Sequence, residues 1–151
     1  MLLRETGLDM DRARIERLGR LHAEAFNDRF CRVRPLRGAR ELLSYLARTG
    51  IPLAIATTGR METARRVLRS LEIGLAGIPI ITREMVAYDK PYPDLFLAAA
   101  EALKADIKTA CVVGDSIWDM LAARYAGALG VGLLSGRYDP DKSERSGAYR
   151  V

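Results

Sequence analysis

Two carboxylates lie four residues apart in the segment Gly114-Asp115-Ser116-Ile117-Trp118-Asp119. Asp115 follows the apolar run of residues 110–113, which predicts a buried strand, and Asp119 falls in the first turn of the helix predicted after it. Carboxylates this close favour a hard divalent cation, and Mg²⁺ typically takes one or two of them together with waters and substrate oxygens. The same residues are also typical of a capping box, in which Ser116 and Asp119 only close the start of a helix.

A lysine on a stiff segment is the second candidate for chemistry. Lys90 precedes Pro91, and a residue before proline is pushed towards extended conformations. Pro93 then opens a predicted helix, where its missing N–H has no cost. The ammonium group is therefore held in place, which suits a fixed positive charge aimed at a phosphate. Taken alone, a solvated surface lysine is the simpler interpretation.

The third candidate is Thr57-Thr58-Gly59, which follows the apolar run of residues 51–56. A hydroxyl at a strand end, with the backbone N–H groups beside it, can bind an anion at the N-terminus of the next helix. The alternative is that Thr57 or Thr58 only caps the helix predicted over residues 60–72.

The elements that position these residues alternate along the chain. Helical patterns cover residues 9–30, 60–72 and 117–126, with two more around Leu42, Leu43 and Leu46 and after Pro93, while apolar runs predict strands at 51–56, 78–81, 110–113 and 129–133. Residues 135–146 predict loop with one short helical turn, and residues 148–151 the start of a final strand. This alternation is typical of an α/β fold with a parallel sheet and helices on both faces. Ligands bind such sheets at the carboxyl ends of the strands, where all three candidates lie.

Composition sets outer limits on function. The 151 residues are 49% hydrophobic and 28% charged, as in ordinary globular proteins, and no apolar run is long enough to span a membrane. The start of the chain lacks a signal-peptide layout, so we expect a cytoplasmic protein. The net charge is +5, but the arginines of the first forty residues are interleaved with acids, as on a solvated helix face, so we expect no nucleic-acid partner.

The scarcity of cysteine and histidine excludes further classes of site. Cys31 and Cys111 form no C-x-x-C pair, and we expect two buried or half-buried thiols. His22 is the only histidine, which excludes a zinc site of the usual ligand set and most Ser-His or Cys-His schemes.

A strand-end Thr57, a pre-proline Lys90 and G-D-S-x-x-D at residues 114–119, in this order, resemble motifs two, three and four of the haloacid dehalogenase (HAD) superfamily. Residues 90–96 are similar to the family's K-P-x-P-D-x-F. The resemblance covers residues 33–151, a Rossmann-like core, and residues 1–32 resemble the second half of a C1-type helical cap. Phosphoglycolate phosphatases and related small-molecule phosphatases share this pattern.

The resemblance implies a role for each candidate. Thr57, with Thr58 and Gly59, would bind the transferring phosphoryl group, and Lys90 would neutralise its charge. Asp115 would ligate Mg²⁺, and Asp119 would complete or orient the metal shell. The implied partner is a small phosphorylated metabolite, with neither nucleic acid nor membrane involved.

The sequence departs from the family in its first motif, D-x-D-G-T, which carries the nucleophilic aspartate at the end of a strand. Asp9-Met10-Asp11 has two of the letters, but no strand precedes it, and we interpret these acids as helix caps. The missing strand would lie between those ending at Thr57 and Gly114, leaving a slot about 10 Å wide. We therefore expect a truncated, inactive part of a longer phosphatase, whose slot is filled by a complementing N-terminal segment or a second chain, unless the flanking strands close up.

Other functions remain open at this point. A 2-haloacid dehalogenase or a phosphomutase would belong to the same family, but the Asp115 carboxylate favours phosphoryl chemistry over dehalogenation. A non-catalytic pseudoenzyme would bind phosphate or a partner without turnover. A flavodoxin-like or response-regulator-like sheet would explain the alternation but not Lys90 together with G-D-S-x-x-D.

Overall fold

The computed structural model describes residues 11–72, 74, 76–135 and 138–150. Contacts divide the chain into two units, Met1–Pro35 and Leu36–Val151. The first unit contains helix α2 (Arg12–Arg29) and the 3-10 turn η1 (Phe30–Arg32). Asp11 caps α2 by accepting a hydrogen bond from the Arg14 N–H at 2.7 Å. It is one of the two residues predicted to cap this helix, and the other, Asp9, lies outside the described residues. That the first unit is part of a helical cap stays a prediction.

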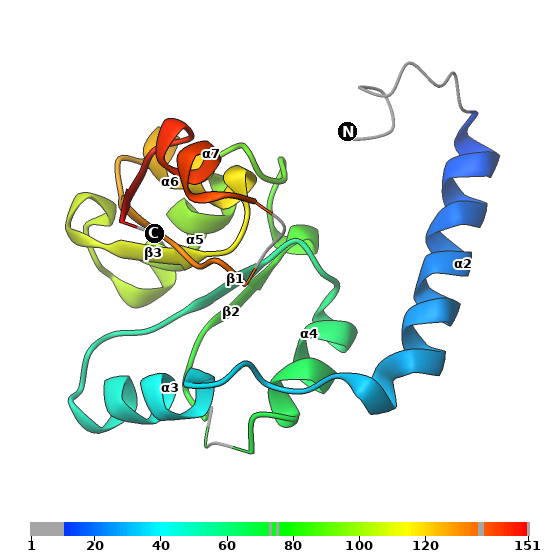
Figure 1. Ribbon diagram of the computed structural model, residues 1–151, viewed down its shortest axis with the longest axis horizontal. Helices are drawn as coiled ribbons and strands as arrows, with labels where there is room; N and C mark the ends of the chain where they lie inside the picture. Colours follow the sequence, from blue (N-terminus) through cyan, green and yellow to red (C-terminus); the bar gives the residue numbers. More distant parts are fainter. Residues whose placement is uncertain (1–10, 73, 75, 136–137, 151) are drawn as a thin grey trace. The chain divides into compact units, whose positions relative to one another are not determined.

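The second unit alternates strands and helices, as the sequence predicts (Figure 1). Its elements in chain order are α3 (Ala39–Arg48), β1 (Ile55–Thr57), α4 (Met61–Arg69), β2 (Ile80–Thr82), η2 (Arg83–Met85), α5 (Asp94–Leu103), η3 (Ile107–Thr109), β3 (Cys111–Gly114), α6 (Ile117–Ala126), β4 (Leu129–Gly132), α7 (Pro140–Arg145) and β5 (Ala148–Arg150). All strand pairs are parallel, so the α/β fold class predicted from the sequence is confirmed. None of the described helices is long and apolar enough to cross a membrane.

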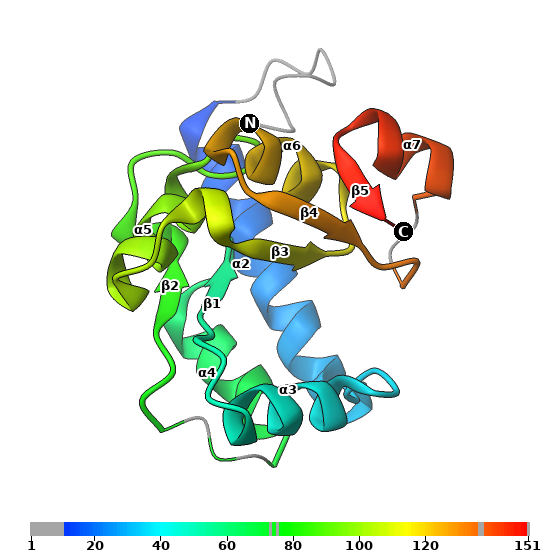
Figure 2. The same ribbon diagram turned by 90° about the vertical axis from the view of Figure 1, so that its left-hand side faces the viewer.

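The strands form two separate groups. β1 pairs with β2, and β3, β4 and β5 follow one another in a three-stranded group (Figure 2). In the part of the chain that the structure describes, β1 and β3 are not hydrogen-bonded to each other. Within the described residues, the flanking strands have therefore not closed up, and none of the described strands lies along the second edge of β1 or of β3.

The sequence predicts the bounds of some strands and helices less accurately than those of others. β1 begins at Ile55, four residues after the predicted start, and ends at Thr57, one residue after the predicted end. The apolar run of residues 51–54 is buried in part but includes Pro52, which has no N–H to give to a ladder. In the tail, Asp139 caps the six-residue helix α7, which exceeds the single turn predicted there, and β5 is the predicted final strand.

One expectation about burial is wrong. Cys31 and Cys111 are both exposed, rather than buried or half-buried. In β3, Cys111 and Val113 are exposed and alternate with buried Val112, because successive side chains of a strand point to opposite faces. The sulfur of Cys111 therefore lies on the exposed face of β3.

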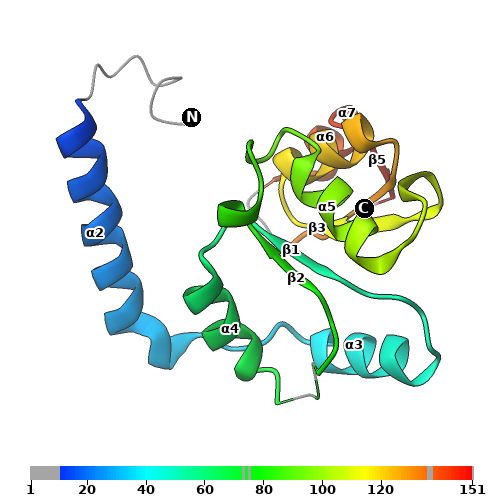
Figure 3. The same cartoon turned by 180° about the vertical axis from the view of Figure 1, so that it is seen from behind.

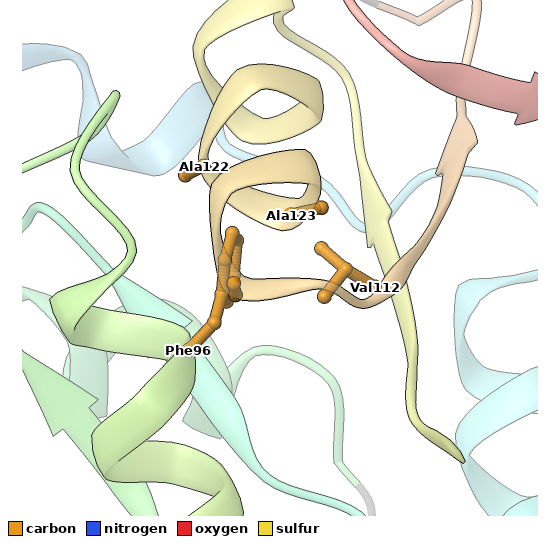
Figure 4. Packing of buried hydrophobic residues seen from close by; sticks show 5 residues of the cluster. Phe96, Val112, Ala122 and Ala123 are labelled. Carbon is orange, nitrogen blue, oxygen red and sulfur yellow. The ribbon is translucent and has the colours of Figure 1, made fainter. Parts of the chain in front are cut away.

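The core of the second unit joins the two strand groups on one side. Phe96 of α5 and Val112 of β3 lie beside Ala122 and Ala123 of α6 in Figure 4, and Ala56 of β1 packs against the same cluster. A second cluster is made by Ile81, Leu95 and Ala99, whose members come from β2 and α5. The helix α5 contacts β1, β2 and α6, and Figure 3 shows it beside these elements. It is therefore the element that holds the β1–β2 pair next to the β3 group.

Candidate functional site

Lys90 and Asp119 form a largely buried ion pair where two predicted site segments meet. The Lys90 Nζ lies 2.7 Å from the Asp119 Oδ1, and the two side chains are only 13% and 10% exposed. Lys90 comes from the loop between β2 and α5, and its peptide bond to Pro91 is cis, while Asp119 lies in the first turn of α6. The structure thus brings together two residues that the sequence nominated separately.

The second oxygen of Asp119 is also engaged. Asp119 Oδ2 accepts hydrogen bonds from the Ser116 N–H at 3.1 Å and from the Ser116 hydroxyl at 2.7 Å. The Ser116 Oγ in turn accepts from the Asp119 N–H, which completes a capping box at the start of α6. The capping alternative is therefore confirmed, and the metal role of Asp119 stays a prediction. Both carboxylate oxygens of Asp119 therefore have hydrogen-bond partners within the chain.

Lys90 has two further neighbours that its sequence position did not reveal. Its Nζ donates a hydrogen bond to the Ala56 carbonyl of β1 at 3.4 Å, and it lies 5.2 Å from the centre of the Phe96 ring. A cation near an aromatic face gains electrostatic stabilisation. The ammonium group thus links β1, α5 and α6, and lies close to the carboxyl end of β1, where Thr57 follows Ala56.

Gly114 is required by the close approach of Asp119. A Cβ atom at Gly114 would lie 2.5 Å from the Asp119 Cβ and 2.7 Å from its Cγ. We expect Gly114→Ala to lower the free energy of unfolding by about 1–3 kcal/mol, because Asp119 must shift away from Lys90 and Ser116. Urea denaturation followed by circular dichroism measures the change.

The matched control for this substitution is Gly74→Ala. No heavy atom lies within 4 Å of a Cβ added at Gly74. Its effect on the free energy of unfolding should be small, and equal losses from the two variants would contradict the role given to Gly114.

Thr57-Thr58-Gly59 forms a local turn at the end of β1. The Thr57 Oγ1 accepts a hydrogen bond from the Gly59 N–H at 3.1 Å, which orients the hydroxyl and leaves its proton free to be donated. Thr57 is half-buried and Thr58 is exposed. Neither threonine caps α4, since the N-cap residue is Arg60 and makes no side-chain cap bond.

A glutamate that sequence reasoning missed lies at the start of α4. The Glu84 Oε2 accepts a hydrogen bond from the Met61 N–H at 3.2 Å, across 23 positions of sequence. A carboxylate at a helix N-terminus satisfies a donor that has no partner within the helix and is favoured by the helix dipole. No local spacing signals such a contact, because the two residues follow different strands.

Asp115 is the exposed carboxylate of the site, directly after β3. Among the described residues, no three His, Cys, Asp or Glu side chains gather as a ready-made metal cluster. A donor set of one available carboxylate suits Mg²⁺, which keeps several waters and uses substrate oxygens. The residues present therefore fit this ion better than a metal that needs an all-protein shell. The metal and phosphate roles of these residues stay predictions.

Comparison with known proteins gives one consistent family. A family model described as haloacid dehalogenase-like hydrolase matches residues 2–127. The chain is similar to a phosphoglycolate phosphatase from Neisseria meningitidis, with 35% identity over 97 residues, covering 64% of this chain and 41% of the relative. This chain spans about half the length of the curated relatives that it matches. It covers 41% of the Neisseria meningitidis protein and 48% of another relative.

Solved structures share the fold. A hydrolase from Pseudomonas syringae aligns with a TM-score of 0.90 and 46% identity, covering 97% of this chain and 69% of that one. A HAD family hydrolase from Deinococcus radiodurans, with bound phosphate and sodium, aligns with a TM-score of 0.79 and 28% identity, covering 99% of this chain and 66% of that one. In both cases nearly all of the present chain has a counterpart in a longer protein.

Proposed function

Because the chain belongs to the haloacid dehalogenase-like hydrolase family, we propose that it forms the phosphate- and Mg²⁺-binding core of a phosphatase for a small phosphomonoester. The observation that carries the proposal is the largely buried side chain of Lys90, fixed 2.7 Å from Asp119 beside the strand end that carries Thr57. A rigid cation at the carboxyl ends of parallel strands is suited to an anionic ligand. The phosphate bound in the Deinococcus radiodurans relative supports the same ligand class.

Thr57 and Lys90 would act on the phosphoryl group directly. The Thr57 hydroxyl, oriented by the Gly59 N–H, would donate to a phosphoryl oxygen, and the Thr58 N–H would complete the anion site, with Gly59 holding Thr57 in place. Lys90 would offset the negative charge shared by the phosphoryl group and its attacker. Phosphoryl transfer depends mainly on such positioning and electrostatic stabilisation.

Asp115 would hold Mg²⁺, with waters and a phosphate oxygen as the remaining ligands. Asp119 would act as a positioning residue, since its oxygens are held by Lys90 and Ser116. The bound ion would supply further charge neutralisation at the phosphate.

The nucleophile would come from a segment that these 151 residues do not contain, because the sequence has no D-x-D-G-T. In the proposed reaction a carboxylate oxygen of that segment forms a bond to phosphorus while the bond from phosphorus to the leaving oxygen breaks. The second acid of the motif protonates the leaving oxygen, and water then releases phosphate from the aspartyl-phosphate. The chain alone would therefore bind phosphate without turning over an ester.

Calorimetric titration of the purified chain with inorganic phosphate tests the binding part of the proposal. We expect Mg²⁺ to raise the affinity of the chain for phosphate at least tenfold, which is about 1.4 kcal/mol of binding free energy. Asp115→Asn should remove this gain. Glu101→Gln, which changes an exposed carboxylate on α5, is the control and should leave the titration unchanged. Phosphate binding that ignores both Mg²⁺ and Asp115 would argue against the assignment.

The absence of turnover is tested separately with p-nitrophenyl phosphate. We expect no Mg²⁺-dependent release of p-nitrophenol from the purified chain above the Asp115→Asn background. Release that this substitution abolishes would show that the 151 residues already contain the nucleophile.

A further inference from the structure

The turn that follows β1 is held at both of its ends by one short stretch of chain. Thr57, the last residue of β1, pairs with Thr82 of β2 in the parallel ladder. The 3-10 turn η2 begins directly after Thr82, and its second residue, Glu84, accepts a hydrogen bond from the Met61 N–H at 3.2 Å. Residues 58–60 therefore run between two points that the end of β2 fixes.

Helix α4 begins without a cap from its own N-cap residue. This residue is Arg60, which makes no side-chain cap bond. The N–H groups of a first helical turn have no partner within the helix, and a carboxylate there is favoured by the helix dipole. Glu84 thus supplies from a distant turn the kind of bond that Ser116 supplies locally at the start of α6.

The same turn also contacts the segment that carries Lys90. The Arg83 Nε lies 3.5 Å from the Oδ2 of Asp89, the residue directly before Lys90. Through its first two residues, η2 therefore contacts both the turn after Thr57 and the segment of Lys90. These are the two parts of the chain proposed to bind the phosphoryl group.

The geometry of the turn decides which of its groups can bind an anion. The Gly59 N–H is bonded to the Thr57 Oγ1 at 3.1 Å, which orients the hydroxyl. The Thr57 hydroxyl and the Thr58 N–H can donate to one anion only while the turn keeps this geometry. A residue that fixes the far end of the turn at Met61 therefore affects anion binding without contacting the anion.

We propose that Glu84 is a positioning residue of the phosphate site: its bond to the Met61 N–H holds the turn at residues 57–59 in the conformation that binds phosphate. This role rests on the proposed function, since it concerns the same ligand. The sign of its effect distinguishes it from a simple charge effect. A carboxylate near an anion repels it, so removing the charge alone would raise the affinity for phosphate, whereas losing the bond would lower it.

Calorimetric titration with inorganic phosphate in the presence of Mg²⁺ tests this role. We expect Glu84→Ala to lower the affinity about fivefold, because affinity falls with the fraction of chains whose turn is ordered and a lost helix cap changes that fraction by about this factor. Glu84→Gln keeps an oxygen acceptor for the Met61 N–H and removes the charge, so it should bind phosphate at least as tightly as the unaltered chain. The control Glu62→Ala removes an exposed carboxylate from the first turn of the same helix and should not lower the affinity.

A second pair of variants removes the donor instead of the acceptor. Met61→Pro deletes the N–H that Glu84 accepts but keeps the carboxylate, at the first helical position, where proline is tolerated. In this background, Glu84→Ala should no longer lower the affinity for phosphate, because the bond is already absent. A loss of the same size with and without the Met61 N–H would contradict a role through this bond.

Amide hydrogen exchange by NMR, without phosphate, measures the hold on the turn directly. We expect Glu84→Ala to speed exchange at Gly59 about fivefold by local opening, and Glu84→Gln to leave it unchanged. Leu95, which is 0% exposed in the core, is the internal reference and should exchange as before. Faster exchange at Leu95 as well would show general unfolding and would overturn a role confined to the turn.

The two measurements separate this role from the proposed function. If the unaltered chain binds no phosphate while Gly59 responds to Glu84→Ala, the proposed function fails and the hold of Glu84 on the turn stands. If the unaltered chain binds phosphate and Glu84→Ala binds it equally or more tightly, the positioning role is overturned and the proposed function stands.

Discussion

Replacing Lys90 with methionine should lower the free energy of unfolding by about 3–5 kcal/mol, because it leaves a buried carboxylate without its counter-charge. The Asp119 side chain is only 10% exposed, and its Oδ1 would lose the ammonium group at 2.7 Å. Methionine keeps much of the length and volume of the side chain, so little of the loss should come from a cavity. Urea denaturation followed by circular dichroism measures it.

The control is an exposed pair of the same residue types. Lys142 lies 3.7 Å from Asp139, and the side chains are 66% and 53% exposed. Lys142→Met should cost about 1 kcal/mol or less, since exposed ion pairs contribute little. Combining Lys90→Met with Asp119→Asn, which removes the unpaired charge, should recover part of the stability. Equal losses from Lys90→Met and Lys142→Met would contradict a buried ion pair.

Truncating Leu95 to alanine should cost about 2–5 kcal/mol of unfolding free energy. Leu95 is 0% exposed and packs with Ile81 and Ala99 in the cluster that attaches α5 to β2. The loss combines the transfer free energy of the removed carbons with the cavity that they leave. Thermal or urea unfolding reports it.

Leu97 offers the matched comparison on the same helix. It is 44% exposed, so Leu97→Ala removes the same atoms from a site in contact with solvent. We expect a loss below about 1 kcal/mol, in line with exposed substitutions. If the two variants unfold alike, the described orientation of α5 is incorrect.

The sequence predicted elements best where short-range signals agree. The helix over residues 117–126 is observed with the same bounds, because Ser116 and Asp119 form its capping box and Gly127 ends it with a left-handed φ of 80°. The start of β1 was predicted four residues too early, because an apolar run marks burial and not ladder hydrogen bonds. The bonds of β1 depend on β2, which lies more than twenty residues further along the chain.

In the candidate site, too, some features could be predicted from the sequence and others could not. Strand ends could be placed from the pattern, and two of the segments that the rule for parallel sheets nominated separately meet in the contact between Lys90 and Asp119. The contact of Lys90 with the Ala56 carbonyl and that of Glu84 with α4 could not be predicted, since they join residues 34 and 23 positions apart without a motif. Such contacts depend on how the elements pack.

The links that Lys90 makes between β1, α5 and α6 also have an evolutionary consequence. A lysine that contributes this much to folding is kept by selection for cellular abundance, even in a lineage that has lost its enzymatic activity. Its presence in a homologue therefore reports an intact fold. Asp115, exposed beside the same site, is under no comparable constraint from packing. Among descendants of such a protein, an aspartate at this position is the better marker of surviving chemistry.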